Sequence, residues 1–252
     1  FPVVLLHGIP GSAQTWDGVA RRLAERHRVV VPDLLGFGAS ARPSAARQLH
    51  AEAQADALGD ALDGLGIERM VLVGHDFGGP VAVTCASRRP ERVAGLALLA
   101  TNAFGDSPVP FPLSLVTAPV VGPAAARLLF SRPSLAMMVR RGCGPGAPPD
   151  MARYLGDRGQ AASVRAIFTA SLRHLAELYG PIEDALGRVA APTLVGWGDH
   201  DPFFSVDQGR RTARAVEGAE LRIYHDAGHF LPEERPAEVA DDIARLAERA
   251  GR

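Results

Sequence analysis

The sequence predicts an α/β protein with a mostly parallel sheet flanked by helices. Short apolar runs rich in Val, Leu and Ile alternate with helix-length segments, the pattern of strands joined by crossover helices. The runs do not alternate polar and apolar residues, which is typical of strands covered on both faces. Between residues 103 and 188 the alternation stops and only helical patterns occur. We therefore expect one sheet interrupted by a helical insertion.

Six apolar runs account for the expected strands. In chain order they are Val3–Leu6, Val29–Val31, Met70–Val73, Val93–Leu99, Thr193–Val195 and Leu221–Tyr224. Between the second and third runs, residues 51–65 carry apolar side chains at helical spacing, and residues 239–250 do the same near the end of the chain. Both segments predict helices that pack on the sheet.

The insertion is expected to form an all-helical cap domain, residues 103–188, after the fourth of these strands. The α/β core would then consist of residues 1–102 and 189–252. Helical patterns cover residues 124–130, 135–141 and 161–178, and a Pro/Gly-rich stretch at 142–149 predicts a loop. A helical insertion between two strands is a candidate lid over the carboxyl edge of the sheet, where open α/β sheets bind ligands.

Composition excludes several classes of protein. The 252 residues are 47% hydrophobic with a net charge of -1, which matches an ordinary globular domain and not a disordered chain. The near-zero charge argues against a nucleic-acid partner, and no apolar run approaches the roughly 20 residues of a membrane span. All 27 basic residues are Arg, so a Schiff-base lysine and pyridoxal-phosphate chemistry are excluded.

The cysteines and the start of the chain bear on its cellular compartment. Cys85 and Cys143 make no disulfide framework and match no metal-ligand spacing. A reducing environment fits this pattern, and we expect a cytoplasmic protein. No signal peptide is visible. Because Phe1 runs directly into the first strand, we expect the natural N-terminus to lie before it.

The strongest chemical signal is the run Gly74-His75-Asp76-Phe77-Gly78-Gly79-Pro80 after the third strand. A buried strand that enters Gly-x-Asp-x-Gly and then a helix predicts a sharp turn, which lifts the central side chain to the top of the sheet. Pro80 suits the first turn of the following helix, and the helix N-terminus favours a negative charge at Asp76. Asp76 is therefore the candidate nucleophile.

Three further motifs follow other strands. His7-Gly8-Ile9-Pro10-Gly11 follows the first strand, and its glycines allow a backbone N–H to face Asp76. The backbone N–H groups of Ile9 and Phe77 would then form a two-donor oxyanion hole. Trp197-Gly198-Asp199-His200-Asp201-Pro202 and Asp226-Ala227-Gly228-His229-Phe230 follow the fifth and sixth strands. Nucleophile, acid and then His is the chain order of α/β-hydrolases.

With these motifs, the chain resembles the α/β-hydrolase superfamily, and within it the branch of epoxide hydrolases and haloalkane dehalogenases. The resemblance covers nearly the whole chain and includes Pro32-Asp33-Leu34-Leu35-Gly36-Phe37-Gly38-Ala39-Ser40; only the cap matches loosely. It implies the α/β-hydrolase fold with two strands before the first one seen here, and a catalytic triad of Asp76, Asp201 and His229.

An Asp at this sharp strand-to-helix turn, the nucleophile elbow, restricts the reactions that the protein could catalyse. A carboxylate is a poor nucleophile toward acyl carbon, because the mixed anhydride returns easily, but it can displace a leaving group from saturated carbon and form an alkyl-enzyme ester. His229, oriented by Asp201, would activate water against that ester. This chemistry needs no cofactor and no metal. The expected substrates are epoxides or alkyl halides.

Epoxides and alkyl halides differ in the leaving group that the site must stabilise. The resembling dehalogenases hold halide with a Trp after the nucleophile and an Asn in the His-Gly-x-Pro loop, whereas Phe77 and Ile9 stand there in this chain. The resembling epoxide hydrolases donate to the epoxide oxygen with two cap tyrosines. We expect the donor among Tyr154, Tyr179 and His174, which occupies roughly the place of the family's second Tyr. A Tyr O–H can donate while neutral at pH 7.

Two other residues keep two interpretations each. Trp16 either packs after the oxyanion loop or forms a pocket wall, and Asn102 either orients water or substrate or caps the start of the cap domain. The segment 109–141 is rich in Leu, Met, Phe, Val and Pro, which predicts an apolar pocket.

The sequence therefore predicts a cofactor-independent epoxide hydrolase that acts on a small hydrophobic organic substrate and water. Its expected partners include no nucleic acid and no membrane, and it is a monomer or homodimer. The alternative functions are a haloalkane dehalogenase with the same triad, an Asp-elbow lyase or cyclase, and a non-enzymatic binding protein.

Overall fold

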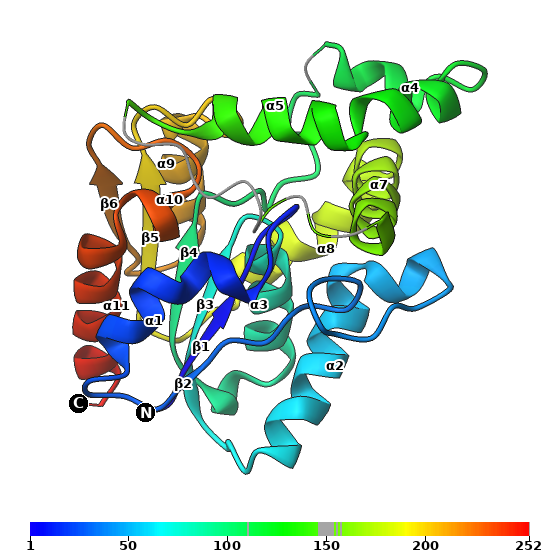
Figure 1. Cartoon of the computed structure of the whole chain (residues 1–252). Coiled ribbons are helices and arrows are strands. Elements are labelled where there is room, and N and C mark those ends of the chain that lie inside the picture. Colours follow the sequence, from blue (N-terminus) through cyan, green and yellow to red (C-terminus); the bar gives the residue numbers. More distant parts are fainter. Residues whose placement is uncertain (110, 146–153, 155, 157, 252) are drawn as a thin grey trace.

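A six-stranded parallel sheet forms the centre of the molecule (Figure 1). The structure is a computed structural model that describes residues 1–109, 111–145, 154, 156 and 158–251. The strand order is β2-β1-β3-β4-β5-β6, and each neighbouring pair is parallel. The strands are β1 (Val3–Leu6), β2 (Val29–Val30), β3 (Met70–His75), β4 (Val93–Leu99), β5 (Thr193–Gly198) and β6 (Glu220–Tyr224). The α/β-hydrolase fold expected from the sequence is confirmed.

Burial explains why the central strands are apolar throughout. Every residue of β1, β3, β4 and β5 is buried, because helices cover both faces of the sheet. The edge strand β6 keeps exposed positions, as an edge of the sheet permits. All six predicted strands occur, and β3 and β5 continue two and three residues beyond the predicted ends.

Helices divide between the two faces of the sheet. One face is covered by α1 (Asp17–Leu23) and α11 (Pro236–Ala250), whose apolar residues pack with Val3, Leu5 and Val71. The other face is covered by α2 (Ala51–Gly64), α3 (Gly78–Arg88) and α8 (Leu175–Leu186), which pack with Val4, Leu6 and Leu72. The remaining elements of the core are α9 (Val206–Ala215), α10 (Leu231–Glu234) and the 3-10 turns η1 (Ala13–Trp16), η2 (Ala46–Leu49) and η3 (Pro90–Arg92).

The regular elements described between β4 and β5 are all helices. They are η4 (Leu113–Thr117), α4 (Gly122–Leu129), α5 (Arg132–Gly142), α7 (Arg158–Arg173) and α8. In Figure 1, α5 lies above the sheet, and α4 lies beside it, above α7. The helical pattern over 161–178 belongs to two helices, since the backbone of His174 (φ -125°, ψ 36°) separates α7 from α8. The predicted loop is described only for residues 142–145.

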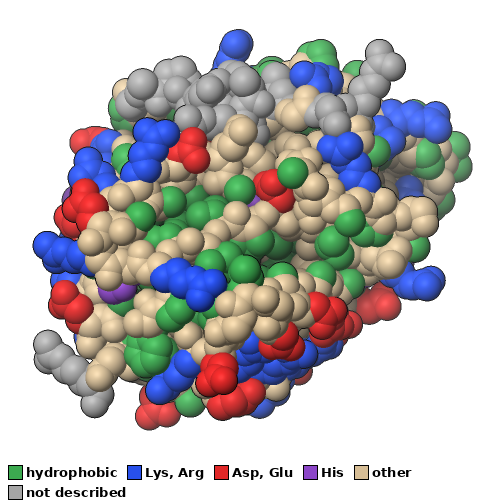
Figure 2. Space-filling view, turned by 60° about the horizontal axis from the view of Figure 1, so that its bottom comes forward, with side chains coloured by type: hydrophobic (Ala, Val, Ile, Leu, Met, Phe, Trp, Pro, Cys, Tyr) green, Lys and Arg blue, Asp and Glu red, His purple; other side chains and the backbone are tan. Residues whose placement is uncertain are grey.

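The surface carries charges of both signs. On the face seen in Figure 2, the described acidic and basic side chains are interspersed. In the described part of the chain, no helix combines the length and the apolar character that a membrane crossing requires.

Candidate active site

Asp76 stands on a strained turn between β3 and α3. Its φ of 49° lies in the left-handed region, which costs a non-glycine residue free energy and is found mostly at functional sites. The turn is fixed by the Asp76 N–H, which donates to the Leu99 carbonyl (3.0 Å), and by the Thr101 hydroxyl, which donates to the Asp76 carbonyl (2.6 Å). A Cβ at Gly78 would lie 2.5 Å from the Leu6 carbonyl oxygen. Only glycine allows α3 to begin this close to β1.

Asp76, His229 and Asp201 meet at the carboxyl ends of β3, β6 and β5. The distance from His229 Nδ1 to Asp201 Oδ2 is 2.9 Å, and that from His229 Nε2 to Asp76 Oδ2 is 3.6 Å. The Asp201 side chain is fully buried, and its Oδ1 accepts the backbone N–H groups of Phe203 (2.8 Å) and Phe204 (3.0 Å). These two donors fix the carboxylate, which in turn orients the imidazole. The structure therefore brings the three predicted triad residues together.

The two carboxylates set the charge of the imidazole between them. Burial alone lowers the pKa of His229, but the charges of Asp201 and Asp76 outweigh it and raise the pKa to about 10. Burial alone raises the pKa of Asp76, and His229 outweighs it and lowers that pKa below the usual value. At neutral pH the free site thus holds an ionised Asp76 carboxylate, which is the form a nucleophile requires.

A backbone donor faces Asp76 from the loop after β1. The N–H of Ile9 donates to Asp76 Oδ1 at 2.7 Å. His7 fixes this loop, because its Nε2 accepts the N–H of Leu34 (3.0 Å) and its Nδ1–H donates to the Gly8 carbonyl (2.8 Å). A Cβ at Gly8 would lie 2.6 Å from Asp76 Oδ1, so glycine permits the close approach. Of the two predicted oxyanion donors, Ile9 contacts the carboxylate, and Phe77 is the residue directly before α3.

A cavity of about 650 Å³ opens above Asp76 and His229. The core supplies Ile9, Phe77 and Phe230, and the β4–β5 segment supplies Phe104, Met138, Phe168, Leu172, Leu175 and Tyr179. Its apolar lining agrees with the apolar pocket expected from the sequence. Polar side chains line the cavity as well, among them Ser107, Gln208 and Arg211.

The three predicted donors occupy different environments. Tyr179 on α8 lines the cavity, and its hydroxyl lies 3.5 Å from Ser171 Oγ. Burial, opposed by the Ser171 hydrogen bond and supported by the charge of Asp76, raises the pKa of Tyr179 to about 12. Tyr154 is also buried, but its ring packs edge-on against Phe230 at 4.8 Å. Burial first, and then the Glu233 carboxylate beside its hydroxyl, raise its pKa well above the usual value.

His174 does not fit the role of donor. Its side chain is 56% exposed, and its Nδ1 lies 3.1 Å from the Glu177 carboxylate. It precedes α8 and is not among the described residues that line the cavity. The sequence places His174 near the expected position, but the break between α7 and α8 leaves it on the surface.

The structure supports different roles for Trp16 and Asn102. Trp16 is fully buried among the side chains beneath α1 and α11, 6.4 Å from the His75 ring, so it is a packing residue and not a pocket wall. Asn102 lines the cavity, but its Oδ1 accepts from Phe104 N, Ser107 Oγ (2.7 Å) and Gln208 Nε2 (2.7 Å). Asn102 thus ties the start of the helical insertion to α9.

Sequence reasoning missed the residue that fixes the His229 loop. Glu234 Oε2 accepts the N–H groups of Gly144 (2.7 Å) and Gly228 (2.9 Å), and its Oε1 accepts that of Phe230 (2.9 Å). The His229 N–H donates to the Gly142 carbonyl at 2.7 Å. These bonds join the loop to the end of α5. In the sequence, Glu234 is one of two adjacent acids and nothing distinguishes it.

Glu234→Gln is expected to destabilise the protein by about 2 kcal/mol, because one carboxylate that accepts three backbone N–H groups becomes an amide with one acceptor oxygen. Urea unfolding measures the change. The matched control is Glu25→Gln, an exposed position in the turn after α1, which is expected to stay within about 0.5 kcal/mol. Equal stabilities of the two variants would contradict a stabilising role for Glu234.

Comparison with known proteins decides the family. The model of the α/β hydrolase fold family matches residues 2–236. The chain belongs to this family. Epoxide hydrolase 3 of Xenopus tropicalis is 30% identical to this hydrolase over 253 residues, which cover 94% of the chain and 68% of that protein. 2-Hydroxymuconate semialdehyde hydrolase of Pseudomonas sp. strain CF600 is also 30% identical, over 95% of the chain and 84% of that protein.

A solved structure shows the same fold. The epoxide hydrolase CorEH superposes with a TM-score of 0.81 at 23% identity, covering 99% of this hydrolase and 92% of that chain. At this identity the likeness shows the fold alone. The relatives carry different activities, so the reaction of this hydrolase has to be argued from its own residues.

Proposed function

We propose that this hydrolase opens a hydrophobic epoxide to a vicinal diol through an ester on Asp76. The observation that carries the proposal is that Asp76, a carboxylate with a lowered pKa, and Tyr179 line the same cavity. A carboxylate attacks saturated carbon productively, whereas its attack on an acyl carbon gives an anhydride that reverts. Of the different activities that the relatives carry, those at a saturated carbon, such as epoxide opening, therefore suit this site.

The residues beside Asp76 favour an epoxide over an alkyl halide. A departing halide needs N–H donors and no proton. The side chains of Phe77 and Ile9 offer none, and the indole N–H of Trp197 donates to the Phe204 carbonyl at 2.8 Å. Neither tryptophan of the chain is among the described lining residues. An epoxide oxygen needs a proton, which the un-ionised Tyr179 hydroxyl can supply at neutral pH.

The first step forms the ester. An Asp76 oxygen attacks one carbon of the epoxide, the C–O bond to that carbon breaks, and Tyr179 protonates the alkoxide. The charge of Asp76 disappears in the ester. His229 then loses one of the two carboxylates that raise its pKa, and it can return a proton to the Tyr179 oxygen. The step therefore leaves His229 neutral, as a general base must be.

The second step hydrolyses the ester. His229 takes a proton from water, and the hydroxide adds to the Asp76 carbonyl carbon. The N–H groups of Ile9 and Phe77 would stabilise the oxyanion. Collapse of this intermediate breaks the ester C–O bond, the released alkoxide takes the carboxyl proton, and the diol leaves. Asp76 is again ionised and His229 again protonated, so one epoxide and one water give one diol without any cofactor.

Tyr179→Phe is expected to lower kcat/KM for an epoxide about 100-fold, because the alkoxide loses its proton donor. The measurement is diol formation from a panel of aryl and alkyl epoxides. Tyr154→Phe and His174→Ala are the matched controls and are expected to keep activity within about threefold. A loss in Tyr154→Phe with none in Tyr179→Phe would reassign the donor, and diol formation by no member of the panel would overturn the proposed function.

A further inference from the structure

Exposed large apolar side chains gather in one part of the helical insertion. In the described part of the chain, nine such side chains are exposed, and six of them belong to residues 111–137. The most exposed are Val120, at 89%, and Phe111, at 78%. The six are Phe111, Leu115, Val120, Val121, Leu128 and Met137. Single exposed apolar residues are ordinary on a protein surface, whereas a group of them marks an interaction site.

The six side chains lie around α4. Both η4 and α5 pack against this helix. Val121, Ala124 and Leu128 are spaced three and four residues apart, so they lie on one side of α4, and all three are exposed. Figure 1 shows α4 and α5 at the upper margin of the molecule. The six residues therefore form one outer surface of the insertion, called the cap surface below.

The charges beside the cap surface are of one sign. Arg127 on α4 and Arg140 and Arg141 on α5 are exposed. The sequences of η4, α4 and α5, and of α7 packed beside them, contain no Asp or Glu. None of these three arginines forms an ion pair with a described residue. An apolar surface flanked by arginines thus lacks acidic neighbours on every element packed against α4.

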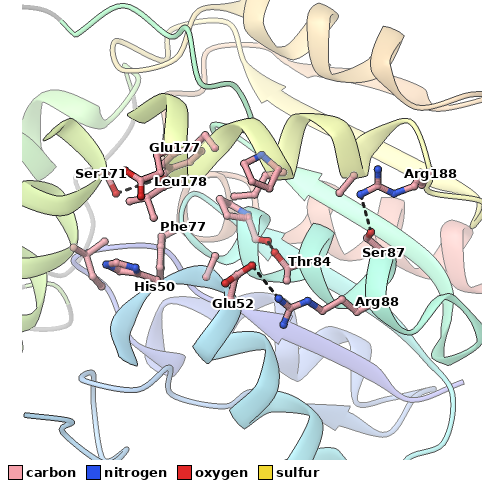
Figure 3. A pocket seen from close by; sticks show the side chains of 17 residues that line it. His50, Glu52, Phe77, Thr84, Ser87, Arg88, Ser171, Glu177, Leu178 and Arg188 are labelled. Carbon is pink, nitrogen blue, oxygen red and sulfur yellow. Dashed lines mark hydrogen bonds and ion pairs between the residues drawn. The ribbon is translucent and has the colours of Figure 1, made fainter. Parts of the chain in front are cut away.

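Arginines on the core are arranged differently. Figure 3 shows two of them beside a second cavity, which lies between α3 and α8. Arg88 pairs with Glu52 at 2.9 Å, and Arg188 donates to the Ser87 hydroxyl at 3.5 Å. The core therefore supplies partners for its own arginines, whereas those beside the cap surface are open to a partner from outside.

An anionic lipid surface suits this combination better than a protein does. A symmetric contact between two copies would bring the same arginines together with no acid on these elements to pair with them. Protein interfaces are commonly anchored by Trp and Tyr, and the cap surface has neither. A lipid layer offers phosphates to the guanidinium groups and hydrocarbon to the apolar side chains.

We infer that the cap surface binds the face of an anionic lipid bilayer. Arg127, Arg140 and Arg141 contact the lipid phosphates, and the apolar side chains enter the boundary between headgroups and acyl chains. The sequence predicts no membrane partner, because no apolar run is long enough to span a bilayer. A contact with the membrane surface requires no such run, so this inference departs from that expectation.

Binding at this surface would place the larger cavity next to the bilayer. Met137 is exposed on α5, and the adjacent Met138 lines the cavity above Asp76 and His229. One helix thus separates the cap surface from that cavity. Apolar molecules dissolve in the hydrocarbon of a bilayer, so docking would hold the cavity near their source. The inference does not depend on which apolar molecule the site transforms.

The test measures sedimentation of the full chain with sucrose-loaded vesicles. Vesicles of equal parts phosphatidylcholine and phosphatidylglycerol are compared with vesicles of phosphatidylcholine alone. Binding to the anionic vesicles is expected to be at least about tenfold tighter, because each arginine near such a surface contributes about fivefold. Raising the salt from about 0.1 M to about 1 M shortens the screening length from about 10 Å to about 3 Å. This change is expected to remove most of the difference.

Two variants test the apolar and the basic part of the surface separately. Leu128→Ser is expected to weaken binding to the anionic vesicles about tenfold, and Arg140→Gln about fivefold. Both side chains are exposed, so both variants are expected to fold as the native chain does. The matched controls are Leu65→Ser, after α2, and Arg21→Gln, on α1. These positions are also exposed but lie on the core, and the controls are expected to bind like the native chain.

The outcomes decide between a membrane and other partners. Equal binding to both kinds of vesicle, or binding to neither, would overturn the inference, as would equal losses in Leu128→Ser and Leu65→Ser. A dimer that Leu128→Ser dissociates, in a chain that binds no vesicle, would assign the cap surface to a second copy instead. None of these assays measures epoxide opening, so the proposed function stands or fails independently.

Discussion

His229→Gln is expected to stop turnover and to leave the opened epoxide attached to Asp76. The first step needs the Asp76 carboxylate and the Tyr179 proton, and both remain in the variant. The second step needs a base that takes a proton from water, and a glutamine amide has none. Intact-protein mass is expected to rise by the mass of one whole epoxide, and peptide mapping to place the gain on Asp76. Steady-state diol formation is expected to fall about 10⁴-fold or more.

The control is His225→Gln, four residues earlier on the same loop. The His225 side chain is 84% exposed and pairs with Asp199 at 3.0 Å, so this variant is expected to turn over normally and to show no adduct. Haloalkanes are tested beside the epoxides. A mass gain of one alkyl group, with halide released, would make the protein a dehalogenase. Normal turnover by His229→Gln would contradict the role of His229 as the base of the second step.

The sequence predicted the parts of the site that a short motif defines. Asp76, Asp201 and His229 each follow a strand within five residues, and parallel strands bring their carboxyl ends to one edge of the sheet. Strand identity and loop length therefore suffice to place the three side chains together. The strand order itself required the structure, as did the length of β5, which continues through Trp197 and Gly198.

The sequence could not choose among the three candidate proton donors in this way. His174 lies in the predicted helical pattern 161–178 and Tyr179 directly follows it, and in a helix a shift of one residue turns a side chain by about 100°. The break at His174 starts a new helix, turns Tyr179 into the cavity and leaves His174 in solvent.

Glu234 could not be predicted from the sequence for another reason. Its three partners are backbone N–H groups from two segments 84 residues apart in the chain, Gly144 and Gly228 with Phe230, and backbone groups carry no sequence signal.

Asp201→Asn is expected to reduce turnover about 10⁴-fold while the protein stays folded. The remaining side-chain oxygen can still accept the N–H groups of Phe203 and Phe204, which places the amide nitrogen against His229 Nδ1. That nitrogen donates where the carboxylate accepted. The imidazole must then carry its proton on Nε2, the atom that should take a proton from water. Diol formation measures the loss, and Asp199→Asn, on the same loop with a side chain 28% exposed, is the matched control.

The same variant is expected to change how stability depends on pH. In the native protein the pKa of His229 is raised from 6.5 to about 10, chiefly by Asp201 and then by Asp76 against the opposing effect of burial. A raised pKa contributes stability that is fully present below pH 6.5 and is lost as the pH rises through about 10. Asp201→Asn removes the carboxylate that raises the pKa of His229 more strongly. In the variant the pKa of His229 is therefore lower, and less stability is lost between pH 6.5 and pH 10. Urea unfolding at pH 6, 8 and 10 compares the two proteins. Other groups that titrate there are common to both, so parallel curves would mean that His229 is not held protonated between Asp201 and Asp76.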